Sequence, residues 1–381
     1  MKIAINALGA KVGGGITYLN RLLFHLSIID EENTYFLFVA PYNREKIITF
    51  SSARFNIINV KVKNVFHRMI YEQIAIPYLL KKLSIDIIYI PGETAPLFTK
   101  LPSIVALQNL KILMPLGLDS SLGQRTRLWL LRKLAMLSFR KAKRIIFVSQ
   151  SSYKYAERIL GINAHKASVI YHGIELDRFS PTRPLRIPKV LEEWVGKRKY
   201  VLFLSTLAQH KNVETLLEAY AGLDKELRSS HPLVLVGKKV QPYFSKLSQL
   251  VYKLDLNEEV LFTDEVPYEE VPSYYRGAIL FVLPSFRETF GMPVLEAMAS
   301  GVPVIASNIP AFSEIVGEAG LLFNPTDPDE LRDKMHKVLT DQYLRDMLIT
   351  KGLSKAKEFS WETTARRTLQ VLNEAFEEGK R

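Results

Sequence analysis

Short apolar runs alternate with amphipathic stretches along the first half of the chain. In the stretch 16–29, Leu19, Leu22, Leu23 and Leu26 recur at the spacing of one helix face. Continuous apolar runs separated by helices are typical of a parallel sheet that helices cover on both faces. The sequence predicts strands at 2–7, 35–39, 85–90, 104–107 and 144–148.

A proline-rich segment interrupts this pattern near the middle of the chain. Pro181, Pro184 and Pro188 stand among charged residues, which indicates a linker. A length of 381 residues suits two domains better than one core. The alternation restarts after the linker, with strands expected at 200–205, 232–237, 260–262, 279–285 and 302–307, and helices at 212–220 and 361–378. We therefore predict two doubly wound, Rossmann-like α/β domains at 1–180 and 199–358, a linker at 181–198 and a C-terminal helix at 359–381.

The segment 286–301, FRETFGMPVLEAMASG, follows a predicted strand and has the features of a loop that leads into a helix. Pro293 suits the first helical position because it has no N–H to leave unpaired. Gly301 suits the residue after the helix. Ligands of open parallel sheets bind beyond the carboxyl ends of the strands. The segment is therefore a candidate ligand site.

Two glutamates and a helix start give this segment its candidate chemistry. Backbone N–H groups at Phe290, Gly291 and Met292 would lie near a helix N-terminus, where they attract phosphate and sugar oxygens. Glu288 could reach sugar hydroxyls from the loop, and Glu296, one turn into the helix, could accept hydrogen bonds from two ribose hydroxyls. A glutamate in a first turn is also favoured by the helix dipole alone. Glu288 could equally be a solvated loop residue, so spacing leaves both interpretations open.

The E-x7-E spacing, followed by EAMASGVPVIAS and GEAGLLFNPTDPDEL, resembles the C-terminal domain of the family 4 retaining glycosyltransferases, which have the GT-B fold. LFLSTLAQHKNVETLLEAY (202–220) resembles their phosphate-binding strand-loop-helix, and VIYHGIELDRF (169–179) resembles the end of their N-terminal domain. FSWETTARRTLQVL (359–372) resembles their last helix, which crosses back to the N-terminal domain. The match covers essentially the whole chain. It implies an α/β GT-B fold, with two Rossmann-like domains that face a cleft.

The resemblance implies that a nucleotide-sugar donor binds mainly to the C-terminal domain. Glu296 would hold the ribose and Glu288 the transferred sugar. The amides near Phe290, Gly291 and Met292 would contact sugar and phosphate oxygens.

Lys211 would neutralise the diphosphate of this donor. Negative charge develops on a phosphate oxygen as the glycosidic bond breaks, and a lysine in a sheltered site stabilises that charge more than it would in water. Family members often carry an arginine near this lysine, whereas here Thr206 and His210 occupy the neighbourhood. His210 could share the phosphate role or be a solvated histidine. Lys211 and Glu288 are the candidate catalytic residues.

A glycine-rich segment, LGAKVGGGITYL, lies between the first predicted strand and helix. Backbone amides of Gly13, Gly14 and Gly15 could approach the diphosphate and the acceptor. A simple flexible turn is the alternative. The glycine spacing does not give the G-x-G-x-x-G fingerprint of NAD-binding domains, and the second strand ends without a carboxylate. We therefore set NAD aside and expect no cofactor.

Many relatives have His-Asp after the strand that corresponds to 104–107, with the histidine near the sugar and acceptor. This chain has Gln108 and Asn109, which are neutral amides that can hydrogen-bond hydroxyls but cannot take a proton at neutral pH. A histidine-based acid/base step is therefore not expected. The resemblance favours same-face attack, in which the departing phosphate oxygen helps to take the acceptor proton, over a double displacement.

These features imply a retaining hexosyltransferase that transfers mannose, glucose or a similar hexose to a glycan or lipid-linked acceptor, as in polysaccharide biosynthesis. Two alternatives are a nucleotide-sugar-binding protein with reduced catalysis, which Gln108, Asn109 and the missing arginine would suit, and a GT-B sugar-nucleotide epimerase.

The D-x-D of Asp327 and Asp329 could suggest a metal-bound diphosphate. A capping aspartate followed by proline explains it better, so we expect metal-independent transfer.

The net charge of +12 admits nucleic acid, an anionic membrane surface and phosphorylated substrates as partners. The stretch 125–144 carries many Lys and Arg and no acid, together with the apolar stripe Leu128, Leu131, Leu134 and Leu137. The stretch 63–82 adds Phe66, Met69, Ile70 and Tyr71 beside basic residues. Such segments suit peripheral attachment to anionic lipid, or they simply cover the sheet with a solvated basic face. No recognised nucleic-acid motif accompanies the charge.

The sequence also bears on the compartment. No run of 18 or more uncharged apolar residues occurs, so no membrane span is expected. The N-terminus resembles a first strand and lacks the apolar core of a signal peptide. The chain has no cysteine, which fits a cytosolic enzyme. We expect a cytoplasmic protein that attaches to the inner face of a membrane if the basic helices bind lipid.

Overall fold

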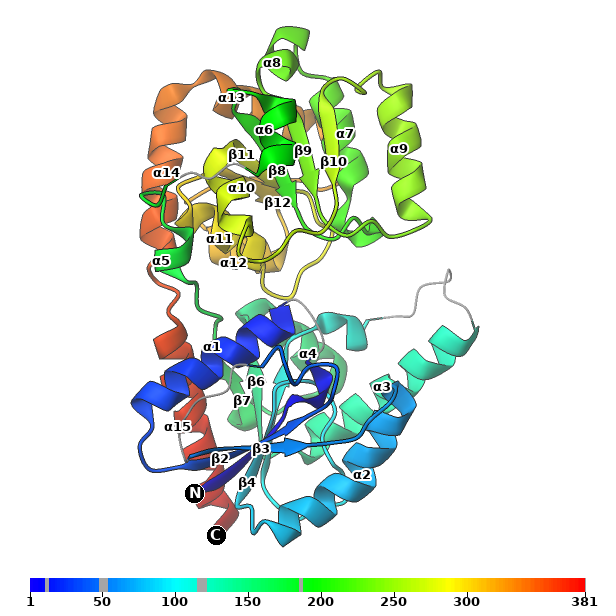
Figure 1. The fold of residues 1–381 in the computed structure, drawn as a ribbon, viewed down its shortest axis with the longest axis vertical. Helices are drawn as coiled ribbons and strands as arrows, with labels where there is room; N and C mark the ends of the chain where they lie inside the picture. Colours follow the sequence, from blue (N-terminus) through cyan, green and yellow to red (C-terminus); the bar gives the residue numbers. More distant parts are fainter. Residues whose placement is uncertain (11–13, 48–53, 115–121, 185–187, 381) are drawn as a thin grey trace. The chain divides into compact units, whose positions relative to one another are not determined.

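The computed structural model describes residues 1–10, 14–47, 54–114, 122–184 and 188–380. The described residues form two compact units (Figure 1). Unit 1 comprises Met1–Gly173 and Trp361–Arg381, and unit 2 comprises Ile174–Ser360. Each unit is a parallel β-sheet with helical connections, as the alternation of apolar runs and amphipathic stretches predicts.

Within its described residues, unit 1 has a seven-stranded parallel sheet in the order β3-β2-β1-β4-β5-β6-β7. The strands predicted around β1, β2, β4, β5 and β6 are confirmed to within about two residues at each end. The edge strands β3 and β7 were not predicted, because both are only partly buried and lack a continuous apolar run. The strands are β1 (Lys2–Asn6), β2 (Thr34–Val39), β3 (Phe55–Asn59), β4 (Ile87–Ile90), β5 (Ser103–Leu107), β6 (Arg144–Phe147) and β7 (Ala167–Val169).

Helices cover both faces of this sheet and build two apolar layers. On one face, α1 and α15 pack against the sheet, and Figure 1 shows α15 in red beside α1 in blue. On the other face, α2, α3 and α4 contribute to the second layer. The helices of unit 1 are α1 (Gly14–Ile29), α2 (Val65–Lys82), α3 (Leu122–Lys141), α4 (Gln150–Leu160) and α15 (Trp361–Lys380), with 3₁₀ turns η1 (Ala7–Gly9), η2 (Leu110–Ile112) and η3 (Ala164–Lys166).

The last helix of the chain completes the core of unit 1. Trp361 is buried, and its ring lies 5.9 Å from that of Tyr18 and 5.7 Å from that of His172. The Thr364 hydroxyl donates to the Tyr171 carbonyl at 2.7 Å. Because apolar burial is the main favourable term in folding, unit 1 depends on a segment that is distant in sequence.

The described part of unit 2 has a six-stranded parallel sheet in the order β10-β9-β8-β11-β12-β13. Its strands are β8 (Tyr200–Leu204), β9 (Leu233–Val236), β10 (Val260–Thr263), β11 (Ala278–Leu283), β12 (Val304–Ser307) and β13 (Leu321–Phe323). Its helices are α5 (Leu176–Phe179), α6 (Lys189–Val195), α7 (Val213–Ala221), α8 (Lys225–Ser230), α9 (Tyr243–Lys253), α10 (Val271–Gly277), α11 (Met292–Ala299), α12 (Pro310–Val316), α13 (Pro328–Thr340) and α14 (Gln342–Ala356), with the 3₁₀ turn η4 (Gln209–Lys211).

The boundary between the units differs from the expected one. Residues 174–198 lie in unit 2, whereas the sequence suggested that the first domain continues to 180 and that a linker follows. Phe179 packs edge-to-face on Tyr268 and Tyr275, and α6 buries Leu191 and Val195. These short helices bury only one or two residues each, too few to give a periodic signal.

Candidate functional site

The strands β8 and β11 lie side by side at the centre of the sheet of unit 2, and the chain order reverses there. This arrangement is the switch point at which open α/β sheets bind ligands. The turn η4 follows β8, and the loop 284–291 follows β11. The Phe286 N–H donates to the His210 carbonyl at 2.9 Å, and the Asn212 amide donates to the Pro284 carbonyl at 3.1 Å. The two loops are thus joined into one structure.

Lys211 and Glu288 form an ion pair at this strand edge. The Lys211 Nζ lies 2.5 Å from Glu288 Oε1, and the two side chains are 10% and 15% exposed. The Ser285 hydroxyl donates to the same carboxylate oxygen at 2.9 Å. Sheltered charges interact more strongly than exposed ones, so this lysine can act on an anionic group that enters from solvent. The structure brings together the two residues that the sequence proposed as catalytic.

Gly291 shapes the loop that carries Glu288. Its φ of +114° lies in a region that residues other than glycine rarely adopt. An added Cβ would also lie 2.8 Å from the Phe312 ring. The helix α11 begins at Met292, so Pro293 occupies its second position and not the first position that the sequence suggested. Gly301 follows the Ser300 cap, as expected.

Phe290 and Met292 flank this glycine. Phe290 is buried, and its ring packs 6.0 Å from that of Phe359. Its side chain therefore belongs to the core of unit 2. Met292 is partly exposed at the start of α11. The amide groups proposed for a ligand thus lie at a helix N-terminus.

Glu296 is buried one turn into α11 and accepts a hydrogen bond of 3.0 Å from the Tyr275 hydroxyl. Burial raises the pKa of Glu296 to about 7, which the Tyr275 hydrogen bond partly offsets. Glu175 raises this pKa further and Arg178 lowers it. The Arg178 guanidinium lies 3.3 Å from Glu175 Oε1. Glu296 therefore contributes a polar group that is largely desolvated.

Sequence reasoning missed the residues around Glu296. Tyr268 donates to Glu175 at 3.3 Å, and the Arg178 guanidinium lies over the Tyr268 ring at 4.8 Å. Glu175 and Arg178 stand in the segment 169–179, which resemblance had placed in the other domain. The sequence ELDRF at 175–179 carried a signal for this pair. Its acid, Glu175, and its base, Arg178, stand three residues apart and so share one face of a helix.

Thr206 precedes η4, and His210 lies within it. Thr206 is exposed and His210 is half-buried, and the contact between the two loops uses the His210 backbone carbonyl. Gly237, which the sequence analysis did not single out, lies at the end of β9 with a φ of +148°. An added Cβ there would lie 1.9 Å from the Ser205 carbonyl oxygen, so glycine permits the close approach of the loop after β8.

The glycine-rich segment of unit 1 differs from the expected loop. Gly14 and Gly15 are the first residues of α1, and Gly13 lies outside the described residues. An added Cβ at Gly14 would meet no atom of the described residues within 4 Å. Gly14 and Gly15 stand at the N-terminus of a 16-residue helix, where backbone N–H groups favour anions.

Gln108 and Asn109 follow β5 at the carboxyl edge of the sheet of unit 1. The Asn109 side chain accepts from the Lys111 N–H at 2.9 Å and caps η2, so its carbonyl oxygen is already engaged. The Gln108 Nε2 is buried and has no hydrogen-bond partner within the described part of the chain. An unpaired buried amide is costly, and a ligand oxygen would satisfy it.

Glu93 is a further residue at this edge, and sequence reasoning missed it. It accepts from the Asn109 N–H at 3.1 Å. Burial raises the pKa of Glu93 to about 7, and hydrogen bonds from backbone groups and the charge of Arg68 lower it in part. Its signal in the sequence was Pro91-Gly92-Glu93, directly after the buried strand β4.

Asp327 is a helix cap, as expected. Its carboxylate accepts from the Glu330 N–H at 2.9 Å, and Asp329 pairs with Arg332 at 2.6 Å. Across the described ranges, no group of three or more His, Asp or Glu side chains could hold a metal ion.

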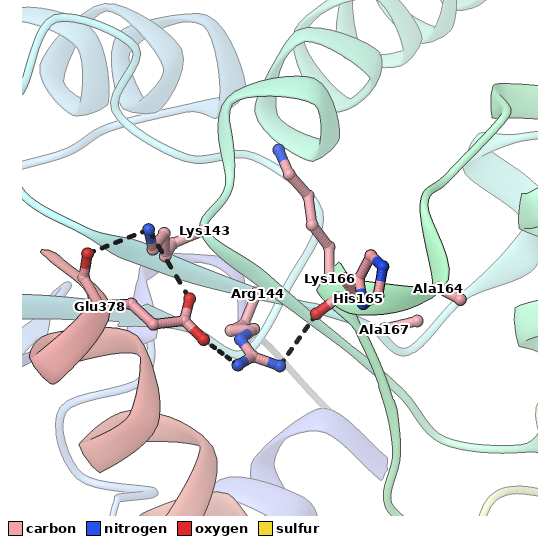
Figure 2. A pocket seen from close by; sticks show the side chains of 7 residues that line it. All are labelled: Lys143, Arg144, Ala164, His165, Lys166, Ala167 and Glu378. Atoms are coloured by element: carbon pink, nitrogen blue, oxygen red, sulfur yellow. Dashed lines mark hydrogen bonds and ion pairs between the residues drawn. The ribbon is translucent and has the colours of Figure 1, made fainter. Parts of the chain in front are cut away.

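A pocket of about 380 Å³ opens in unit 1 beside the end of α15 (Figure 2). Glu378 pairs there with Arg144 and, at 3.6 Å, with Lys143. The Arg144 guanidinium also donates to the His165 carbonyl at 2.9 Å. The pocket lies at the amino ends of β6 and β7, opposite the edge where such sheets bind ligands. We assign it to the attachment of α15.

Comparison with known proteins agrees with this geometry. The chain matches the family model described as Glycosyl transferases group 1 over residues 190–355 and the model described as Glycosyltransferase Family 4 over residues 34–178. It is 34% identical over 235 residues to O-antigen chain mannosyltransferase B of Escherichia coli, which covers 61% of each chain. The chain spans only 21–28% of the length of the serotype-specific mannosyltransferases WbdA of Escherichia coli.

Solved structures share the fold over nearly the whole chain. Sucrose-phosphate synthase from Thermosynechococcus elongatus superposes with a TM-score of 0.76 at 21% identity, and the match covers 99% of this chain and 100% of the other. Anabaena Alr3699/HepE in complex with UDP and glucose gives a TM-score of 0.75 at 21% identity, with 98% and 99% covered. These likenesses confirm the expected GT-B fold.

Proposed function

Because the chain belongs to the family 4, group 1 glycosyltransferases, we propose that it is a retaining hexosyltransferase. It transfers a hexose from a nucleotide-sugar donor to a glycan or lipid-linked acceptor. The observation that carries this proposal is the sheltered pair of Lys211 and Glu288, 2.5 Å apart at the switch point of unit 2. The name of the Escherichia coli relative favours mannose as the sugar, and glucose is the alternative.

The donor is held by unit 2 in this proposal. Glu296 accepts hydrogen bonds from the ribose, and the amides near Gly291 and Met292 contact sugar and phosphate oxygens. Glu288 accepts hydrogen bonds from the hexose and holds Lys211 in place. Desolvation of the Glu296 carboxylate supports this role, because hydroxyl donors stabilise the charged form that burial disfavours.

Lys211 stabilises the leaving group. The bond between the hexose C1 and a diphosphate oxygen breaks, and its electron pair stays on that oxygen. The ammonium neutralises the developing charge. The acceptor hydroxyl oxygen bonds to C1 on the same face, and its proton passes to the departing phosphate oxygen. Glu288 then positions the sugar and is not a nucleophile.

Unit 1 supplies groups suited to an acceptor hydroxyl. The Glu93 carboxylate can accept its hydrogen bond, and the unsatisfied Gln108 Nε2 can donate to its oxygen. In this proposal, Glu93 and Gln108 together make the hydrogen bonds to the acceptor that the histidine makes in many relatives. The reaction requires no cofactor and no metal ion in this proposal, since Lys211 provides the positive charge.

The test uses the purified full chain with GDP-mannose, UDP-glucose and ADP-glucose, and with lipid-linked glycans extracted from a bacterial envelope. We expect one donor to give a product one hexose heavier by mass spectrometry, with unchanged rate in EDTA and with retained anomeric configuration by NMR. Bound donor with neither hydrolysis nor transfer would overturn the assignment as a transferase. Loss of activity in EDTA would overturn the metal-independent mechanism.

A further inference from the structure

The outward face of α2 is apolar, which is the reverse of an ordinary surface helix. The four positions Phe66, Ile70, Ile74 and Tyr78 are 51%, 59%, 69% and 66% exposed. They are spaced by four residues and so form one stripe along three turns. Over α2, whose residues are all described, every exposed position before its last turn belongs to this stripe. The opposite side of the helix buries Ile76 and Leu80 in the core.

Of the four apolar residues that the sequence analysis named in the stretch 63–82, Phe66 and Ile70 belong to the exposed stripe. Met69 is buried and Tyr71 is partly buried, so these two residues of the expected basic-apolar face point to the protein. On α3, Leu131 is buried, whereas Leu137 is exposed. The periodicity alone could not distinguish the core side of each helix from its solvent side.

Two neighbouring segments extend the α2 stripe. Phe98 is 76% exposed in the loop whose residue Leu97 accepts from Lys141 on α3 and donates to Gln73 on α2 at 2.8 Å. On α3, Trp129 and Leu137 are exposed. Both helices pack on the same face of the sheet. Their outer sides therefore belong to the same side of unit 1. We call Phe66, Ile70, Ile74, Tyr78, Phe98, Trp129 and Leu137 the α2–α3 surface.

The charge around this surface is positive. The sequence of α3 contains no acid, and that of α2 contains only Glu72, which is buried and pairs with Arg68. Exposed basic side chains lie on both helices: Lys81, Lys82, Arg125, Arg127, Lys133, Arg140 and Lys141. The Lys133 ammonium lies 5.8 Å from the Trp129 ring. The basic side chains suit a partner with an anionic surface, and the apolar stripe suits a partner with an apolar interior beneath that surface.

We propose that the α2–α3 surface docks on an anionic lipid bilayer. Tyrosine, tryptophan and lysine side chains favour the boundary between headgroups and acyl chains, since each has an apolar body and a polar end. Phenylalanine and isoleucine side chains add apolar surface that can enter the acyl region. A helix with an apolar stripe and basic flanks lies in the plane of that boundary. No helix in the described part of the chain is long and apolar enough to cross a membrane. This property goes beyond the transfer reaction and uses none of its residues.

A vesicle co-sedimentation experiment tests the proposal with the full chain and no donor. We expect binding to phosphatidylcholine vesicles with 30 mol% phosphatidylglycerol, and at least tenfold weaker binding to phosphatidylcholine alone, because basic residues near an anionic surface each add attraction. High salt should weaken the binding. Equal binding to both vesicles would overturn the charge argument.

Variants then locate the surface. The double variant I70S/I74S should lose at least tenfold in vesicle affinity while its melting temperature and donor binding stay near those of the parent. The matched control is Y252S/Y343S, which removes two exposed apolar side chains of unit 2 that are 78% and 80% exposed, and it should bind as the parent does. Wild-type vesicle binding by I70S/I74S would overturn the proposal. A parent dimer that I70S/I74S converts to monomer would assign the surface to protein contact and would also overturn it.

Discussion

Lys211 and Glu288 form the residue pair on which the chemistry depends. In E288Q the side chain keeps its size but loses the charge that holds Lys211. We expect turnover to fall by roughly 10²–10³-fold, the range seen when one electrostatic group of a transition state is removed. Donor affinity should change by less than about threefold, because the ribose contacts remain. Steady-state kinetics and donor titration measure the two effects.

The control for this substitution is E318Q. Glu318 pairs with Lys351 at 3.2 Å but is 91% exposed, and such pairs contribute little. E318Q should therefore have parental kinetics. A donor affinity lowered more than tenfold in E288Q, with turnover unchanged, would assign Glu288 to ground-state binding.

Glu296 links the site to stability through its raised pKa. Its pKa in the folded protein is about 7, above the ordinary value near 4.5, so the folded state binds the proton more tightly. The stability cost of the buried charge is absent below about pH 4.5, grows as pH rises and is complete above pH 7. E296Q should raise the free energy of unfolding at pH 8 by about 3 kcal/mol and leave it nearly unchanged at pH 4.5.

Denaturant titrations of the parent and E296Q at the two pH values measure this difference. The same substitution should weaken donor binding, because a neutral amide accepts weaker hydrogen bonds than a carboxylate. A stability gain at pH 4.5 as large as at pH 8 would show that packing and not charge is responsible.

Glu93 should set the pH dependence of acceptor use. Its pKa of about 7 means that the carboxylate form, which accepts a hydroxyl hydrogen bond, becomes populated as pH rises through 7. We expect kcat/KM for the acceptor to rise about tenfold between pH 6 and 8 in the parent and to stay flat in E93Q. Acceptor-independent donor hydrolysis should keep the same pH profile in both proteins. A parental rise in E93Q would exclude this carboxylate from acceptor binding.

At the scale of elements, the loop between β11 and α11 depends on a single backbone conformation. G291A should destabilise unit 2 by roughly 1–3 kcal/mol, because alanine is strained at this φ and its Cβ would collide with Phe312. It should also lower donor affinity, since the α11 amides would move. Thermal unfolding and donor titration measure the two losses. G317A is the control: Gly317 has a φ of +52° but open space around it, so it should lose stability without losing donor affinity.

The sequence predicted the central elements because burial on both sides makes their strands continuously apolar, as in β4 and β11. It missed the edge strands β3, β7 and β13, although it predicted the edge strand β10. The edge strands β3 and β7 lack a buried apolar run, and α5 and α6 are shorter than two turns of a recognisable period. Such segments acquire their structure from tertiary contacts, and the sequence around them carries little local signal.

At the scale of the whole molecule, unit 1 joins two distant parts of the chain. W361A should destabilise unit 1 by about 3–5 kcal/mol, the usual cost of removing a buried large aromatic side chain, because Trp361 packs on Tyr18 and His172. Unit 2 should keep its stability, since Trp361 is not part of it. Hydrogen exchange followed by mass spectrometry resolves the two units, and equal loss of protection in both would contradict this assignment.

The sequence predicted those residues of the candidate site that lie in a single strand-loop-helix segment. It missed residues that reach the site from separate segments of the chain. Glu288 and Lys211 each follow a buried strand, so the switch-point rule could find them. Glu175 approaches Tyr268 from 93 residues away along the chain, and Glu93 meets Asn109 from another strand end. Pairings of this kind depend on the order of the strands, which local patterns do not determine.

The division of unit 1 also has a consequence for how the protein is made. A ribosome delivers all of unit 2 before it releases α15. The earlier part of unit 1 must therefore wait, without the helix that packs beside α1, until α15 has been made. Premature termination near residue 360 would leave unit 2 intact and the other unit open, a state that chaperones and proteases would recognise.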